Sequence, residues 1–269
     1  MSMELKRRFS KATHRRGLFW NGLRAGYLLV TGKVFMMMVH RRALRKRRDA
    51  LRNKGAEQFK VVMGLCREAG AKPHLTFGTL LGCYRDRGLI KDDEDFDLGF
   101  FPDEIPDMDL LHKKVLEAGF EPHFEGKLQG KLAEIGKYHV RQYLHRDDGV
   151  SVDFNMFYRV RNSVVFFEDR SSDYLYREQL RQTGVFDGGQ DVIGYAMVYP
   201  ADIYQSFKKE RFLGEEVLVP SGTQRFLELT YGEWKTPTKK FKYDNLRVVV
   251  YDASNDRYDF VTPVYPKEI

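Results

Sequence analysis

The stretch FGTLLGCYRDRGLIKDDEDFDLGF, residues 77–100, decides the fold and carries the candidate chemistry. It opens with Gly78 and Thr79 behind a short apolar run, and five carboxylates occupy the six positions 92–97. If Gly78 and Thr79 begin a helix, their free backbone N–H groups suit a phosphate. We therefore expect an anion cradle and an acidic site to meet in one place.

Residues 95–98 alternate between acidic and apolar side chains. In a strand, alternate residues point to opposite faces, so Asp95 and Asp97 share one face while their apolar neighbours enter the core. Two carboxylates held so close repel each other unless a divalent cation lies between them. Oxygen ligands alone suit Mg²⁺ or Mn²⁺. An acidic run by itself is usually a solvated turn, but the continuation into Gly99 and Phe100 favours a buried strand.

Two ordered blocks of residues resemble the LicD/fukutin family. The first block is Gly78-Thr79-Leu80-Leu81-Gly82, Arg85, Gly88, Ile90, Asp93, Asp95 and Asp97. The second is Phe212-Leu213-Gly214, Val219-Pro220, Phe226-Leu227, Tyr231-Gly232-Glu233-Trp234 and Thr236-Pro237. The blocks lie more than a hundred residues apart, and the resemblance covers roughly residues 56–240.

The resemblance implies an α+β fold with a polymerase-beta-like nucleotidyltransferase core, a mixed sheet flanked by helices. It implies a transferase that moves a phospho-alcohol from a CDP-activated donor, such as CDP-choline, CDP-ribitol or CDP-glycerol, to a sugar hydroxyl of a cell-surface glycan, releasing CMP. The partners would be the CDP-alcohol and a glycan acceptor, with two Mg²⁺ or Mn²⁺ ions as cofactors. The residues alone lead only to phosphoryl transfer assisted by a divalent metal.

A second alternating run, residues 151–157, supplies a third carboxylate. Its pattern puts Asp153 on the face opposite Val152, and the resemblance marks the same position as the partner of the Asp-x-Asp strand. An exposed aspartate on an edge strand is the alternative interpretation of Asp153.

The expected roles divide the site into three groups. Asp95, Asp97 and Asp153 are the expected metal ligands, and Asp93 or Glu94 is the nearest candidate base. Gly78, Thr79, Gly82, Arg85 and Lys91 are expected around the donor, with Arg85 steadying the developing charge. Lys91 and Asp92 replace a Pro-Trp pair that many family members carry, so we expect them to influence which donor is used.

Composition limits the class of protein. Hydrophobic residues make up 42% of the chain and aromatic residues 14%, which is typical of a globular protein and excludes general disorder. The two cysteines, Cys66 and Cys83, have no C-x-x-C spacing. A zinc knuckle is therefore excluded, and a disulfide framework is disfavoured.

Positive charge is concentrated at the N-terminus. Residues 1–60 contain 17 Lys and Arg against 3 Asp and Glu, whereas the remainder contains 28 basic and 35 acidic residues. We therefore divide the chain into a basic N-terminal segment, 1–54, and a catalytic domain, 55–269. The mainly apolar residues 17–39 contain Arg24 and Lys33, which favours either an interfacial membrane helix or a helix that packs on the domain.

The basic run 41–54 predicts a helix without interleaved aromatic residues, so nucleic-acid binding is not expected. An anionic membrane surface is the expected partner, with the protein cytoplasmic and peripheral on the inner face of the membrane. Two other functions remain open. One is nucleotidyl transfer with pyrophosphate release, and the other is a non-catalytic adaptor that binds membrane or nucleic acid, against which the complete set of three aspartates argues.

Periodicity predicts the remaining elements. Helices are expected at 56–69, from 79, and at 108–118, 199–209 and 221–231; strands are expected at 74–77, 96–101, 120–124, 137–144, 151–157 and 164–167. Residues 170–195 are expected to form a loop with one short helix.

Overall fold

The computed structural model describes residues 38–39, 41–168, 190–237, 246–252 and 255–261. The chain divides into two units, residues 1–46 and 47–269. The described residues of the first unit are helical, and every candidate site residue belongs to the second. Most of the apolar segment 17–39 lies outside the described residues. Within the described part of the chain, no helix has both the length and the apolar character needed to cross a membrane.

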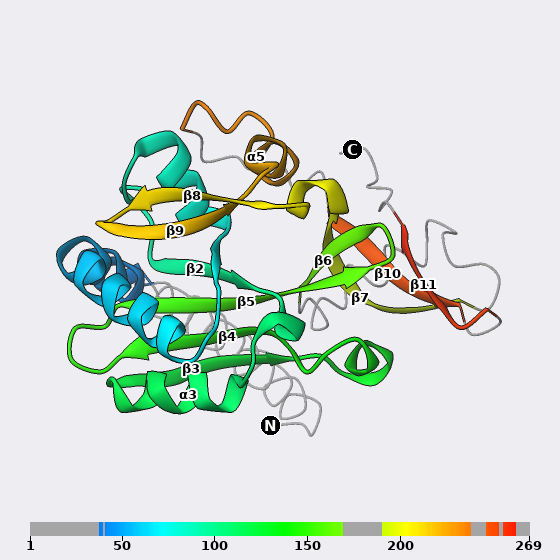
Figure 1. Cartoon of the computed structure of the whole chain (residues 1–269), viewed down its shortest axis with the longest axis horizontal. Helices are drawn as coiled ribbons and strands as arrows, with labels where there is room; N and C mark the ends of the chain where they lie inside the picture. Colours follow the sequence, from blue (N-terminus) through cyan, green and yellow to red (C-terminus); the bar gives the residue numbers. More distant parts are fainter. Residues whose placement is uncertain (1–37, 40, 169–189, 238–245, 253–254, 262–269) are drawn as a thin grey trace, which may run out of the picture. The chain divides into compact units, whose positions relative to one another are not determined.

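The second unit is built on strands, with helices at the sides of the sheet (Figure 1). The strands are β1 (His74–Leu75), β2 (Asp95–Phe100), β3 (Phe120–Lys127), β4 (Tyr138–His145), β5 (Ser151–Val160), β6 (Ser163–Glu168), β7 (Gln190–Pro200), β8 (Phe207–Phe212), β9 (Glu215–Pro220), β10 (Leu246–Asp252) and β11 (Arg257–Val261). The helices are the part of the long 41–68 helix that belongs to this unit, 47–68, then α2 (Phe77–Leu81), a π-helical turn (Gly82–Asp86), α3 (Met108–Glu117) and α5 (Thr223–Tyr231). Short 3-10 turns span Pro102–Glu104, Gly130–Glu134 and Ala201–Tyr204.

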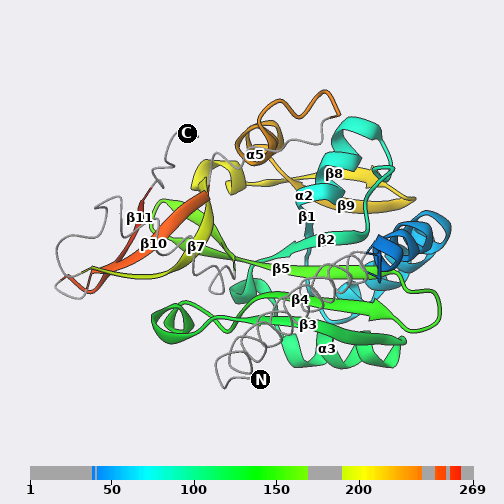
Figure 2. The same cartoon turned by 180° about the vertical axis from the view of Figure 1, so that it is seen from behind.

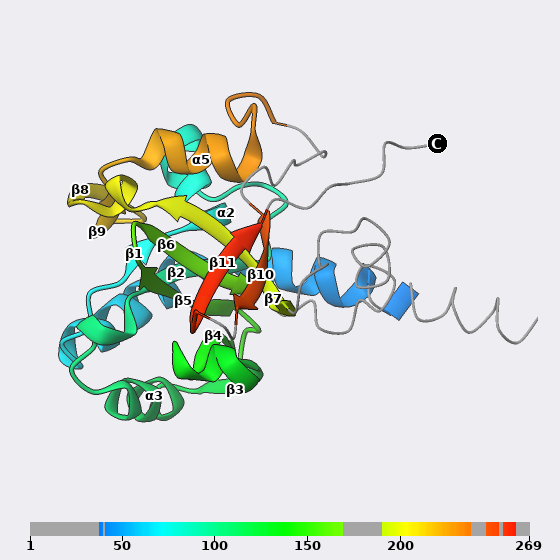
Figure 3. The same cartoon turned by 90° about the vertical axis from the view of Figure 1, so that its right-hand side faces the viewer.

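Strand β5 is the centre of the sheet. The order is β11-β10-β7-β6-β5-β2-β1-β9-β8, while β4 also pairs with β5 and β3 pairs with β4. Residues 151–156 of β5 run parallel to β2, and its last residues pair with β6, the first of the antiparallel β6–β7–β10–β11 strands seen nearest the viewer in Figure 3. The β1–β9 pair is also parallel. The fold is therefore α+β with a mixed, nucleotidyltransferase-like sheet, which confirms the predicted class.

The two faces of β2 have different neighbours, as its alternating sequence predicts. Phe96 is buried, and its ring lies 5.0 Å from the ring of Phe59 on the 47–68 helix. Asp97, on the opposite face, contacts Gly78 of α2, which lies beside β1 and β2 in Figure 2. The apolar face of β2 thus faces the main core, and its acidic face contacts α2 and forms part of the candidate site.

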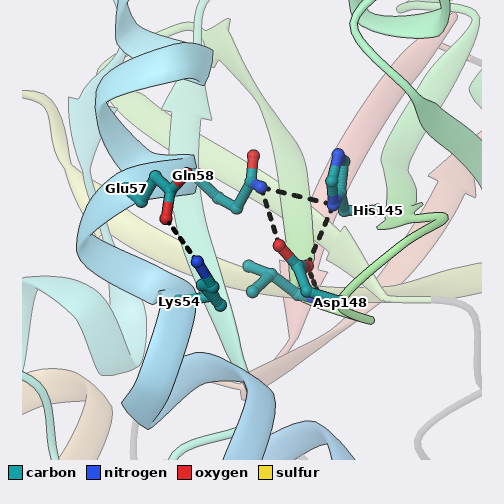
Figure 4. Close-up of polar contacts among 6 residues, drawn as sticks. Lys54, Glu57, Gln58, His145 and Asp148 are labelled. Atoms are coloured by element: carbon teal, nitrogen blue, oxygen red, sulfur yellow. Dashed lines mark hydrogen bonds and ion pairs between the residues drawn. The ribbon is translucent and has the colours of Figure 1, made fainter.

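The 47–68 helix is also fastened to the turn that joins β4 to β5 (Figure 4). The Gln58 side-chain amide donates to Asp148 Oδ2 at 2.7 Å, and the backbone N–H of Val150 donates to Asp148 Oδ1 at 2.9 Å. His145 Nδ1 lies 3.0 Å from the same carboxylate. Gln58 and His145 are both buried, so this cluster connects a helix to the strand that carries Asp153.

Three expectations about elements change. The helix expected at 199–209 is wrong: β7 continues to Pro200, a 3-10 turn follows, and β8 pairs with β9. The basic side chains of β8 are exposed while Phe212 is buried, a pattern that suits an outer strand. Of the loop expected at 170–195, residues 190–195 belong to β7, and residues 170–189 lie outside the described residues. Helix α5 begins at Thr223, and Ser221 does not cap it, because its hydroxyl approaches the carbonyl of Ile203 at 3.4 Å.

Candidate active site

Three of the predicted carboxylates come together through the pairing of β2 with β5. The parallel register places Asp97 opposite Asp153 and Asp95 opposite Ser151. Because the strands are in register, Asp95, Asp97 and Asp153 lie on the same face of the sheet. Asp97 and Asp153, which are 56 positions apart in sequence, thereby become neighbours on adjacent strands.

Asp97 is the centre of the local hydrogen bonding. Its Oδ2 accepts from the backbone N–H of Gly78 at 3.0 Å, and its Oδ1 accepts from the Asn155 side chain at 3.2 Å. Its own backbone N–H donates to the Thr79 hydroxyl at 2.8 Å. The Gly78-Thr79 turn, predicted as an anion cradle, is thus bonded directly to the acidic strand.

The backbone before this turn is strained. Phe77 has φ of 40°, a left-handed conformation that is unusual for an aromatic residue. Its ring is held against those of Phe157 and Phe166, at centroid distances of 5.9 and 5.0 Å. A Cβ on Gly78 would lie 2.8 Å from an oxygen of Asp93, so the close approach of turn and carboxylates requires glycine here.

Two amide side chains that sequence reasoning did not single out complete the site. Gln142 on β4 donates to Asp153 Oδ1 at 2.7 Å, and Asn155 bonds Asp97 as described. Asn155 was detectable, because it lies two residues after Asp153 and therefore on the same strand face. Gln142 gave no signal, since its position depends on how β4 pairs with β5.

The acidic groups resist ionisation. Burial, followed by the charge of Asp95, raises the pKa of Asp93 to about 7. Burial also raises the pKa of Asp97 well above its usual range, and the charges of Asp95, Asp93 and Asp153 add to this. The pKa values of Asp95 and Asp153 are raised as well, mainly by burial and then by Glu94 and Asp95 respectively. At neutral pH the cluster therefore favours any cation that relieves this repulsion.

The donor set fits a hard divalent cation, because it consists of clustered carboxylate oxygens with no sulfur or imidazole. As positioned, however, no group of three or more His, Cys, Asp or Glu side chains among the described residues forms a metal site. In this arrangement Asp97 uses both oxygens for Gly78 and Asn155, and Asp153 uses one for Gln142. Each of these oxygens keeps a further lone pair, so a metal can bind while the hydrogen bonds from Gln142 and Asn155 orient the carboxylates, provided that the carboxylates move closer together.

The two candidate bases differ in their surroundings. Glu94 is paired with Arg48 of the 47–68 helix at 2.9 Å, so its charge is already neutralised. Asp93 points towards Gly78 and also lines a cavity beside the helix. Lys91 lines the same cavity, and its backbone carbonyl accepts from Arg52 at 3.2 Å.

Gly82 and Arg85 have structural partners in place of an open donor site. A Cβ on Gly82 would lie 2.5 Å from the carbonyl oxygen of Gly88, so this glycine permits a close backbone contact. Arg85 forms two hydrogen bonds with Asp86, at 2.7 and 2.8 Å, and one with the carbonyl of Trp234 at 3.3 Å. That last bond connects the two sequence blocks on which the family resemblance was based.

Comparison with known families agrees with this architecture. The family described as LicD/FKTN/FKRP, nucleotidyltransferase domain, matches residues 70–222, which include every predicted site residue. The chain belongs to the LicD family. No curated protein matches the chain. The part that defines LicD membership excludes the 47–68 helix, although Arg48 and Gln58 of that helix contact the matched segment.

Proposed function

We propose that the protein is a metal-dependent phosphotransferase of the LicD family. It moves a phospho-alcohol, such as phosphocholine, ribitol phosphate or glycerol phosphate, from a CDP-activated donor to a sugar hydroxyl and releases CMP. The observation that carries the proposal is the in-register pairing of Asp97 with Asp153, beside a glycine turn bonded to Asp97. Family membership supports a transferase that modifies glycans, while the donor and the acceptor are part of the proposal.

Asp95, Asp97 and Asp153 would hold the metal. Bound Mg²⁺ or Mn²⁺ neutralises phosphate oxygens in such transfers and keeps attacking and leaving oxygens in line. Gln142 and Asn155 orient the carboxylates through their hydrogen bonds. Gly78 and Thr79 hold the acidic strand through their hydrogen bonds to Asp97, so the donor phosphates would lie beside this turn.

Asp93 is the better candidate for the base that accepts the proton of the sugar hydroxyl. In the metal-free protein, burial and then the charge of Asp95 raise its pKa to about 7, but a metal held by Asp95 would lower that value. The choice of Asp93 therefore rests on its position, next to Gly78 and in the lining of the cavity. Glu94 is disfavoured because Arg48 already neutralises it.

The test is a screen of CDP-choline, CDP-ribitol and CDP-glycerol for CMP release with Mg²⁺ or Mn²⁺. The Asp97→Asn variant should lose activity by several orders of magnitude, since an amide cannot balance the charge of a metal. Its affinity for Mn²⁺, measured by electron paramagnetic resonance, should fall in parallel. Normal CMP release by this variant would refute the site assignment.

Nucleotidyl transfer is the second candidate, because the matched domain is a nucleotidyltransferase domain. The released product separates the two: CMP supports the proposal, and pyrophosphate from a nucleoside triphosphate supports nucleotidyl transfer. The non-catalytic adaptor predicts neither product.

We further propose that the basic N-terminal segment, and not the catalytic domain, holds the protein at the cytoplasmic face of an anionic membrane, and that nucleic acid is not a partner.

A further inference from the structure

A cavity of about 340 Å³ lies beside the acidic cluster, between the 47–68 helix and the turn that precedes β2. Its rim contains three cationic side chains, Arg48, Arg52 and Lys91, and its apolar wall includes Leu51 and Leu213. Asp93 is the acidic residue of the lining. The cavity is therefore a concave site with a cationic rim, apart from Asp95, Asp97 and Asp153, which do not line it.

The cations of the rim are not all neutralised. Arg48 is paired with Glu94, but Lys91 forms no ion pair with any residue that the structure describes. Arg52 donates to the carbonyl of Lys91 and reaches Asp49 only at 3.9 Å. The bond to the Lys91 backbone holds Arg52 at the cavity, which Lys91 also lines, so the rim carries excess positive charge that suits an anion.

Asp93 connects the cavity to the acidic cluster. One of its oxygens lies within 2.8 Å of the position that a Cβ on Gly78 would occupy, and Asp97 lies 3.2 Å from that same position. A molecule in the cavity would thus contact the acidic cluster at Asp93, whereas the Gly78 turn contacts the same cluster at Asp97. A transfer needs two substrates that reach one site from different directions.

Two walls of the cavity have different origins. Lys91, Asp93 and Leu213 belong to the matched segment 70–222, while Arg48 and Arg52 lie outside it. The donor nucleotide is the substrate that the matched domain itself would be expected to bind. A subsite completed by residues outside that segment is better suited to the other substrate, the acceptor.

We propose that this cavity is an acceptor subsite that binds a phosphate ester on a sugar or polyol. The inference rests on the proposed function, since it assigns the second substrate of the same site. The rim cations bind the phosphate, and the aliphatic wall of Leu51 and Leu213 contacts the carbon skeleton. A volume of about 340 Å³ is within the size range of small-molecule sites. The acceptor is accordingly an anionic, phosphate-bearing glycan or polyol, not a neutral sugar.

The test measures binding, without turnover, to the full chain in EDTA. Glycerol phosphate and CMP are titrated separately by calorimetry into wild type, Arg52→Gln, Lys91→Gln and Ala56→Glu, the last of which adds a negative charge to the exposed lining. Each substitution should weaken glycerol phosphate binding by at least about fivefold and leave CMP binding unchanged. Lys209→Gln is the control, because it removes one exposed positive charge on β8 from a residue that does not line the cavity.

Three results would overturn the assignment. Unchanged glycerol phosphate affinity in all cavity variants would remove the subsite, and an equal loss in Lys209→Gln would show that the attraction is non-specific. Weakened binding of CMP, or of CDP-glycerol titrated in the same way, would assign the cavity to the donor. Thermal unfolding confirms that each variant is folded. If the cavity variants behave as expected but no CDP-alcohol yields CMP, the anion site stands and the proposed function fails.

Discussion

At the scale of single residues, Asp97 combines two roles that oppose each other energetically. It holds the glycine turn through Gly78 and Thr79, which stabilises the local structure. It is also surrounded by Asp93, Asp95 and Asp153, and their repulsion raises its pKa after burial has already done so. A site that costs stability without its ligand is typical of function, because natural proteins keep such conflicts only where chemistry needs them.

Two glycines of the first motif should respond differently to alanine. Gly82→Ala places a Cβ 2.5 Å from a backbone carbonyl, which cannot move easily, so we expect a loss of about 1 to 3 kcal/mol in unfolding free energy. Gly78→Ala instead meets the side-chain oxygens of Asp93 and Asp97, which can shift. It should retain most of the stability but lose activity on the order of 100-fold, since the carboxylates are displaced.

Urea unfolding and CMP release, measured on both variants, check this contrast. If Gly82→Ala were as stable as wild type while Gly78→Ala unfolded, the assignment of one glycine to packing and the other to the site would be reversed.

The acidic cluster also predicts how stability depends on pH. The folded-state pKa of Asp93 is about 7, raised by burial and then by Asp95, whereas the unfolded value is about 4. Between these values the folded chain binds more protons than the unfolded chain, so stability falls as pH rises. Asp95, Asp97 and Asp153 act in the same direction. Metal-free protein should therefore lose a few kcal/mol between about pH 5 and pH 8, at about 1.4 kcal/mol per pKa unit.

Urea midpoints at several pH values in EDTA measure this slope. Asp97→Asn should flatten it, because removing one carboxylate relieves the other three. Added Mg²⁺ should flatten it in wild type through preferential binding to the folded state. A stability that rises over this range would show that the carboxylates do not repel each other as inferred.

At the scale of elements, periodicity predicted what depends on local sequence. The alternation at 95–98 and 151–157 gave both acidic strands and the face of each carboxylate, as β2 and β5 confirm. The helix expected at 199–209 failed because β8 is a strand only through its pairing with β9. The pair β10–β11 was not anticipated at all. Strand pairing is set by partners distant in sequence, so local sequence patterns could predict neither these strands nor the contact of Gln142 with Asp153.

The same limit applies to the basic run 41–54. Its charge predicted a membrane-facing helix, yet Arg48 and Arg52 contact the turn before β2. Ala50 and Leu51 of the same run are buried. Composition showed that the helix is basic, but only the packing of its apolar residues determines which cations face the domain.

The link between the 47–68 helix and the β4–β5 turn can be tested by a double-mutant cycle. Burial raises the pKa of Asp148, but hydrogen bonds from Val150 and Gln58 outweigh it, so the net pKa is lowered. Asp148→Ala should cost about 1 to 3 kcal/mol, because it leaves the buried Gln58 amide without this acceptor. Gln58→Ala should cost about 1 kcal/mol, because the partly exposed Asp148 keeps its contacts with Val150 and His145. Together they should cost clearly less than the sum of the two.

Unfolding in urea at pH 7 measures the cycle (Figure 4). Val164→Ala, a buried position on β6 without contact to this cluster, provides a matched comparison that should combine additively with Gln58→Ala. Strict additivity of Gln58→Ala with Asp148→Ala would mean that the hydrogen bond contributes nothing to stability.

At the scale of the whole molecule, charge and chemistry belong to different parts of the chain. Residues 1–46 contain 12 Lys and Arg and a single acidic residue, whereas all the proposed catalytic groups lie beyond residue 77. The boundary at residue 46 also decides where a truncated protein should begin, since deleting residues 1–54 would remove the buried Leu51 and the Arg48–Glu94 pair. A deletion that ends at residue 46 keeps the core and both contacts of the helix with the site.

Deleting residues 1–46 should therefore separate membrane binding from catalysis. Each Lys or Arg near an anionic bilayer contributes on the order of 1 kcal/mol, and salt reduces this contribution. The truncated protein should no longer co-sediment with phosphatidylserine liposomes but should still release CMP with a water-soluble acceptor. Arg41, Arg42, Arg45 and Lys46 are exposed in the described helix, and changing all four to Gln should weaken liposome binding while keeping the chain length. Equal co-sedimentation with and without the segment would refute the membrane anchor, and a truncated protein that fails to fold would show that the segment packs on the domain.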